Sequence, residues 1–72
     1  MKPLHLSSRQ RRRLEKQLRN ARDARVYRRT LAVLEFDQGR SVTGISRSLH
    51  VSRPSIYRWI ERYRESSNPE AL

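Results

Sequence analysis

Residues 41–60 read SVTGISRSLHVSRPSIYRWI and carry the most regular pattern in the chain. Ser41 and Ser52 each precede a run with helical periodicity and are good N-cap residues, so we expect one helix over residues 42–49 and a second over residues 53–65. Apolar residues recur at the spacing that lets two helices pack across a tight turn, namely Ile45, Leu49, Val51, Ile56 and Trp59. The pattern therefore predicts a helix-turn-helix.

The predicted turn departs from the usual helix-turn-helix pattern at two positions. Alanine is most common where the two helices cross closely, and glycine is most common where the turn needs a positive φ. This chain has Ser46 and His50 at those positions. Histidine is among the residues that are enriched at positive φ, so the turn is still predicted, at some cost in free energy. We expect a helix interface that is less stable than usual.

Two further helices are expected ahead of this motif, over residues 7–20 and 23–38. In the first, Leu14, Leu18 and Ala21 recur at i, i+4 and i+7 and form a narrow apolar stripe. The opposite side of that helix carries five basic residues, which are Arg9, Arg12, Arg13, Lys16 and Arg19. The helix is therefore expected to pack through its leucines and to present a basic face outward.

The helix over residues 23–38 is apolar over about half of its circumference, which predicts a central position in the fold. Its apolar residues are Val26, Tyr27, Thr30, Leu31, Val33 and Leu34, extended by Ala32 and Phe36. Gly39 is expected to end it at positive φ. We therefore predict an all-α fold, a small bundle of about four helices with a homeodomain-like helix-turn-helix. This domain covers residues 1–65, and residues 66–72 are expected to be a tail or the start of a linker.

The charge of the chain indicates its partner. There are 17 lysine and arginine residues against 7 acidic residues, a net charge of +10. Such an excess in a small domain favours an anionic polymer as the partner. The excess is uneven, because residues 1–29 carry 11 basic and 2 acidic side chains, whereas residues 30–72 carry 6 and 5. Most of the basic residues are arginines, whose planar guanidinium matches both phosphate groups and guanine edges.

Several other classes of protein are disfavoured. The chain has no cysteine, so a disulfide framework is excluded and a reducing cytoplasm fits. No apolar run approaches the roughly 20 residues that span a bilayer, and the N-terminal residues lack the apolar segment of a signal peptide. His5 and His50 are isolated from other metal ligands, so we expect no metal and no cofactor. The acidic residues look like partners for nearby arginines, and we expect no enzymatic activity.

The order of these features resembles the N-terminal DNA-binding domain of bacterial insertion-sequence transposases of the mariner-like group. The resemblance covers most of the chain and is carried by RRTLAVLEFDQGRSVTGISRSLHVSRPSIYRWIERY at residues 28–63. It is most specific in the recognition-helix motif, which consists of Ser52, Arg53, Ile56, Tyr57 and Trp59. It implies binding to the terminal inverted repeats of a mobile element, in the bacterial cytoplasm at the nucleoid.

Transposases of that group also carry a separate catalytic domain with three carboxylates and magnesium, and we expect that domain to be absent from this chain. We therefore expect a fragment, a truncated product or a stand-alone DNA-binding protein. The partner is expected to be double-stranded DNA, without a small-molecule substrate and without a membrane.

The helix over residues 53–65 is the expected recognition helix. Residues expected to contact bases in the major groove are Arg53, Ser55, Tyr57, Arg58 and Arg62. Residues expected to contact phosphates are Ser41, Arg47, Ser52, Arg9, Arg12, Arg13 and Lys16. Trp59 and Tyr63 share a stripe with Ile56 and Ile60, so we expect them in the core rather than stacked on exposed bases.

Other functions use the same features and stay open. A small stand-alone transcriptional regulator would use the same recognition helix. A protein-interaction module would instead need apolar residues on the outer face of that helix, and an RNA-binding protein would use the basic first helix. A homo-oligomer would need an apolar stripe left over after folding. Phe36 and Ala32 are the only candidates for such a stripe, so the sequence gives no support for an oligomer.

Overall fold

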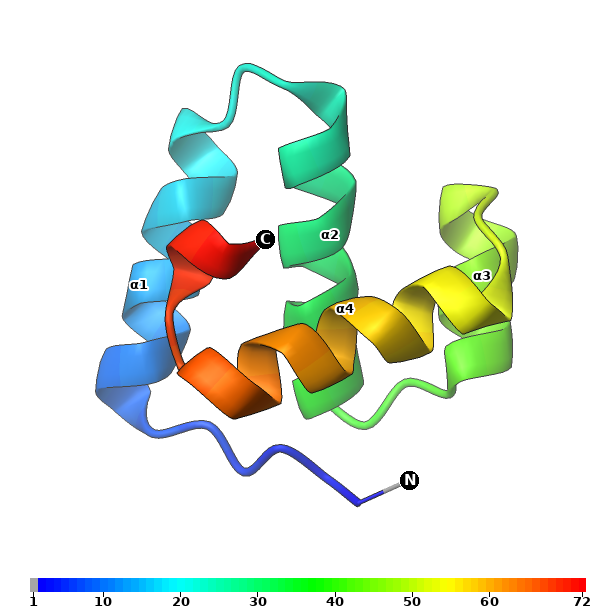
Figure 1. Ribbon diagram of the computed structural model, residues 1–72, viewed down its shortest axis with the longest axis horizontal. Helices are drawn as coiled ribbons and strands as arrows, with labels where there is room; N and C mark the ends of the chain where they lie inside the picture. Colours follow the sequence, from blue (N-terminus) through cyan, green and yellow to red (C-terminus); the bar gives the residue numbers. More distant parts are fainter. Residues whose placement is uncertain (1) are drawn as a thin grey trace.

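The computed structural model describes residues 2–72, which form four α-helices and one short 3-10 helix (Figure 1). The elements are α1 (Ser8–Asn20), α2 (Ala24–Asp37), α3 (Val42–Leu49), α4 (Arg53–Ser66) and the 3-10 helix η1 (Pro69–Ala71). The described residues contain no strand, and the predicted all-α fold is confirmed. Residue 1 of the predicted domain lies outside the described residues.

Local sequence signals set the helix boundaries. The N-caps are Ser7, Asp23, Ser41 and Ser52, and in each case the side-chain oxygen accepts a hydrogen bond from a backbone N–H of the first turn. Gly39 ends α2 with a φ of +97°, in the left-handed region that favours glycine. His50 ends α3 with a φ of +57°, so the turn conformation predicted for this histidine is confirmed.

α2 is the central helix and packs against α1, α3 and α4. α1 runs beside it, and α4 crosses its lower half (Figure 1). Two clusters of buried residues meet on α2. The first joins Leu6, Leu14, Val33, Leu34, Tyr63 and Leu72, and the second joins Ala32, Val42, Ile45, Ile56 and Ile60. Trp59 of α4 is half-buried and packs against both clusters, so α4 is fixed by the whole core.

The burial of α2 differs from the prediction at two residues. Tyr27 was expected on the apolar face and lies on the same side of α2 as Thr30 and Leu34, yet it is 44% exposed. It lies in the first turn of α2, away from the half of the helix that α4 crosses (Figure 1). Ala32 was expected to be spare for an oligomer, yet it is fully buried against α3 and α4. Ala32 is therefore not available to a second copy of the chain.

Residues 66–72, expected as a tail or linker, fold back onto the domain. Pro69 and Leu72 are buried, and Leu72 belongs to the first core cluster. The side-chain amide of Gln17 in α1 donates to the hydroxyl of Thr30 in α2 at 2.9 Å and to the carbonyl of Pro69 at 2.7 Å. This amide joins three segments that are distant in the sequence, so η1 is part of the packed domain.

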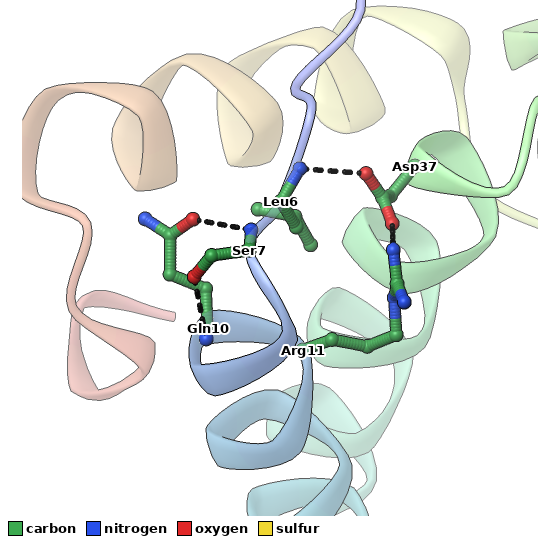
Figure 2. Close-up of polar contacts among 5 residues, drawn as sticks. All are labelled: Leu6, Ser7, Gln10, Arg11 and Asp37. Carbon is green, nitrogen blue, oxygen red and sulfur yellow. Dashed lines mark hydrogen bonds and ion pairs between the residues drawn. The ribbon is translucent and has the colours of Figure 1, made fainter.

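The start of α1 is attached to the end of α2 through Asp37 (Figure 2). One carboxylate oxygen accepts from the backbone N–H of Leu6 at 3.0 Å, and the other accepts from the Arg11 guanidinium at 3.2 Å. Only 4% of the Asp37 side chain is exposed. Ser7 and Gln10 form a capping box in the same turn, which stabilises the helix start without a charge.

The hydroxyl of Tyr63 and the Nε atom of Arg29 are buried polar groups without a hydrogen-bond partner among residues 2–72. Tyr63 is 2% exposed. Burial raises the pKa of Tyr63, because the phenolate is poorly solvated there. The expectation that Tyr63 lies in the core is confirmed.

We predict that Tyr63→Phe removes part of the alkaline destabilisation of the domain. Above pH 10 or so the unfolded chain loses the phenol proton while the folded chain retains it, so the free energy of unfolding falls as the pH rises through this region. Urea unfolding at a series of pH values measures this. Tyr63→Phe should be within about 1 kcal/mol of wild type near pH 7 and decline less above pH 10.

The exposed Tyr57 provides the matched control for this measurement. Tyr57 is 42% exposed, so Tyr57→Phe should follow the pH dependence of the wild-type chain. Equal alkaline declines for wild type and Tyr63→Phe would contradict the burial argument.

Candidate nucleic-acid interface

The turn between α3 and α4 is closed by Ser46 and Val51. The Ser46 hydroxyl donates to the carbonyl of Val51, and the backbone N–H of Val51 donates to the carbonyl of Ser46 at 3.2 Å. Ser46 stands where alanine is more common, and its hydroxyl finds a partner inside the motif. Together with the left-handed His50, these bonds fix where α4 begins relative to α3.

α4 has one buried face and one exposed face. Ile56 and Ile60 are buried against α2 and α3, and Tyr63 is buried against α1 and α2, with 0–2% of each residue exposed. The residues of α4 that were predicted to contact bases and are exposed in the structure are Arg53, Tyr57, Arg58 and Arg62. Because a helix turns about 100° per residue, Tyr57, Arg58 and Arg62 lie outside the buried stripe and project toward solvent. Arg53 is in line with Ile60 but is exposed because it is the first residue of α4.

The exposed arginines of α4 are not engaged by other residues of the domain. Among residues 2–72, no ion pair or side-chain hydrogen bond involves the guanidinium of Arg53, Arg58 or Arg62. Arg64 differs, because it pairs with Glu61 at 3.4 Å and donates to the backbone carbonyl of Lys2 at 2.6 Å. Glu61, the acidic residue nearest to Arg58 in the sequence, therefore pairs with Arg64 and not with Arg58.

Two of the predicted serine contacts lie at the start of α4 and bond to each other. The Ser52 and Ser55 hydroxyl oxygens are 2.9 Å apart, and the backbone N–H of Ser55 donates to the Ser52 hydroxyl at 3.4 Å. Ser52 is exposed and Ser55 is half-buried. The structure thus places Ser55 at the flank of the exposed face, beside the cap.

The remaining predicted phosphate contacts of the motif lie on α3. Ser41 and Arg47 are exposed, and the Ser41 hydroxyl accepts from the backbone N–H of Gly44 at 3.0 Å as a helix cap. Sequence reasoning missed Arg40, which donates to Glu35 at 2.8 Å and to the carbonyl of Gly44 at 3.3 Å. Arg40 connects the end of α2 to the first turn of α3 and so orients the motif. The spacing of Glu35 and Arg40 on either side of Gly39 was the available signal.

The basic residues predicted on the first helix form a separate surface, which we call the α1 basic face. Its members are Arg9, Arg12, Arg13, Lys16 and Arg19, and all five are exposed. Arg11 is next to Arg12 and Arg13 in the sequence but does not belong to this face, because its guanidinium points to Asp37 (Figure 2). The α1 basic face lies on the opposite side of α1 from the buried Leu14.

The described residues give no sign of a metal site or a membrane segment. Within residues 2–72, no three histidine or acidic side chains are grouped closely enough to hold a metal ion. None of the described helices is both long enough and apolar enough to cross a bilayer.

α3 and α4 are joined by a tight turn, and the outer face of α4 is exposed and carries arginines that have no partner among the described residues. This is the arrangement of the helix-turn-helix class of DNA-binding domains. The sequence profile of the homeodomain-like domain matches residues 23–72, and the chain belongs to this family. The match starts at the N-cap of α2, so α1 lies outside it. This fold is a DNA-binding fold rather than a catalytic one. Comparison with curated proteins and with solved structures gave no significant match.

We predict that His50→Gly stabilises the domain by roughly 1 kcal/mol. Left-handed backbone costs a residue with a Cβ about 1–2 kcal/mol, and the greater chain entropy of unfolded glycine offsets part of the gain. Urea unfolding at neutral pH measures the difference. His50→Ala keeps the Cβ and is the matched control, for which no stabilisation is expected. A His50→Gly chain no more stable than His50→Ala would show that the turn is not strained.

Proposed function

We propose that this domain recognises a specific duplex DNA sequence by placing the first half of α4 in the major groove. The observation that carries the proposal is the exposed face of α4, where the guanidinium groups of Arg53, Arg58 and Arg62 have no partner among the described residues. An arginine that binds both the O6 and N7 atoms of guanine is the most common specific contact in the major groove.

Each residue of this face has a distinct proposed role. Arg53 and Arg58 read guanines, and Tyr57 packs on a thymine methyl or donates to a phosphate. Ser55, at the flank of the face, and Arg62, one turn beyond Arg58, extend the contact to neighbouring positions. Arg53 and Arg58 are about 7.5 Å apart along the helix axis, within reach of base pairs that are stacked at about 3.4 Å.

Phosphate contacts on either side would fix the register of α4. Ser41, Arg47 and Ser52 lie at the ends of α3 and at the start of α4, and all three are exposed. Contacts of this kind hold the protein on the duplex and carry no base information. They are therefore expected to contribute affinity for all duplexes alike.

The biological target that we propose is the terminal inverted repeat of a mobile element, with the domain acting as the DNA-binding part of a transposase. The support is the resemblance of residues 41–63 to the recognition motif of mariner-like insertion-sequence transposases. The alternative, a stand-alone transcriptional regulator, uses the same face of α4. Selected sites that match transposon ends would favour the first function, and sites that match promoters would favour the second.

We predict that Arg53→Ala and Arg58→Ala each relax sequence preference. Selection from a random duplex library should give a defined motif for the wild-type chain. Each variant should lose preference at one base position, with a loss of discrimination of about 1–3 kcal/mol there.

Arg25→Ala is the matched control for these variants. Arg25 is an exposed arginine at the start of α2, where it pairs with Asp23 at 3.5 Å, and its loss should leave the selected motif unchanged. If the two α4 variants weakened binding to every duplex by the same factor, α4 would not be reading bases and the proposal would fail.

A further inference from the structure

Like Arg53, Arg58 and Arg62 of α4, the residues of the α1 basic face have no partner among the described residues. Among residues 2–72, no ion pair and no side-chain hydrogen bond is recorded for Arg9, Arg12, Arg13, Lys16 or Arg19. The one acidic residue of α1, Glu15, lies outside this face and is half-buried. Arg9 and Arg19 are about 15 Å apart along the helix axis, so the face is long enough to follow several phosphates of one strand.

The α1 basic face and the exposed face of α4 point in different directions. Leu14 of α1 and Tyr63 of α4 are buried in the same cluster, so both helices turn their inner sides toward this cluster and their outer sides away from it. Lys16 follows Leu14 by two residues, which places it roughly 200° around α1. In Figure 1, α1 stands at one edge of the molecule and α4 crosses α2. A duplex held on the outer face of α4 therefore does not lie against the α1 basic face.

The charges of the α1 basic face repel one another, and only Arg19, in the last turn, is at a position where the helix dipole favours a basic residue. Its members recur at i+3 and i+4, and like charges at these spacings destabilise a helix by about 0.2–0.5 kcal/mol per pair. The first turn contains Arg9 and no acidic residue, although the helix dipole favours acidic residues there. α1 is instead held by its capping box, by the buried Leu14 and by the bond from Arg11 to Asp37 (Figure 2). None of the five charges is held in an ion pair or a side-chain hydrogen bond among residues 2–72.

We propose that the α1 basic face binds the phosphates of a second duplex, so that one domain joins two DNA segments. This inference rests on the proposed function, because the first segment is the one that α4 holds. Duplex DNA is favoured over single-stranded nucleic acid because α1 has no aromatic residue on which unpaired bases could stack. The contact is made to phosphates alone, so it is independent of sequence and sensitive to salt.

The test is the stoichiometry of the complex in native mass spectrometry at low salt. The full chain is mixed with an excess of a short duplex of about 16 base pairs that contains the selected site, which spans about 54 Å at 3.4 Å per base pair. We expect a species with one chain and two duplexes, and the second duplex should be released first as salt is raised.

The variant for this test is the double substitution Arg12→Gln with Lys16→Gln, at two exposed positions whose charges oppose helix formation. It should leave a species with one chain and one duplex. Any remaining second association should have a salt slope smaller by roughly 1.8, which is about 0.9 for each lost contact. Arg25→Gln, at an exposed arginine outside the α1 basic face, is the matched control and should keep the species with two duplexes.

Three outcomes would overturn the inference and leave the proposed function standing, and a fourth would refute the proposed function and the inference with it. If only one duplex binds, and both the α1 variant and the α4 variant (Arg53→Ala with Arg58→Ala) weaken its binding, both faces share one duplex. A single bound duplex that only the α4 variant weakens would mean that α1 binds none. Displacement of the second duplex by a single-stranded RNA of equal length, added so that the total phosphate concentration equals that of the duplex, would make the α1 basic face an RNA surface. A single bound duplex that only the α1 variant weakens would instead refute the proposed function of α4.

Discussion

The burial of one face of α4 is the interaction on which the rest of this structure depends. Ile56 and Ile60 pack against α2 and α3, and Tyr63 packs against α1 and α2, so the two core clusters meet along a single helix. That burial leaves the opposite side of α4 in solvent, with its arginines directed outward. The same clusters set α1 at the edge of the molecule. The positions of both basic surfaces therefore follow from how α4 is packed.

Two groups of arginines in this chain have different roles. Arg11, Arg40 and Arg64 are bound to carboxylates or backbone carbonyls and connect segments of the fold, and Arg29 donates to the carbonyl of Leu72 and lies over the ring of Trp59. Such arginines stabilise a small domain that has no disulfide. Arg53, Arg58 and Arg62 of α4 and the arginines of the α1 basic face have no such partners among the described residues. Charge on these two surfaces is available for a polyanion.

Local features of the fold could be predicted from the sequence, and long-range contacts could not. The caps at Ser41 and Ser52 and the left-handed His50 follow from neighbouring residues, and so does the exposure of Arg53 and Arg58 once Ile56 and Trp59 are placed inward. Asp37 bonds to Leu6, 31 residues away in the sequence, and to Arg11, 26 residues away. Gln17 bonds to Thr30, 13 residues away, and to Pro69, 52 residues away. The spacing of apolar residues along the sequence gives no information about contacts between residues so far apart, so the packing of residues 66–72 was missed. The bond between Ser52 and Ser55 was missed because a hydroxyl that caps a helix and one that faces a groove have the same sequence signature.

The central claim is that a helix face, and not the net charge of the chain, recognises DNA. The most direct measurement is the change in backbone amide NMR signals when the selected duplex is added to the nitrogen-15-labelled chain. We predict that the largest changes lie in residues 52–62 and persist when salt is raised enough to weaken contacts to phosphates alone. Changes confined to residues 9–19 that disappear with salt would contradict the claim and would leave the charge of α1 as the only source of binding.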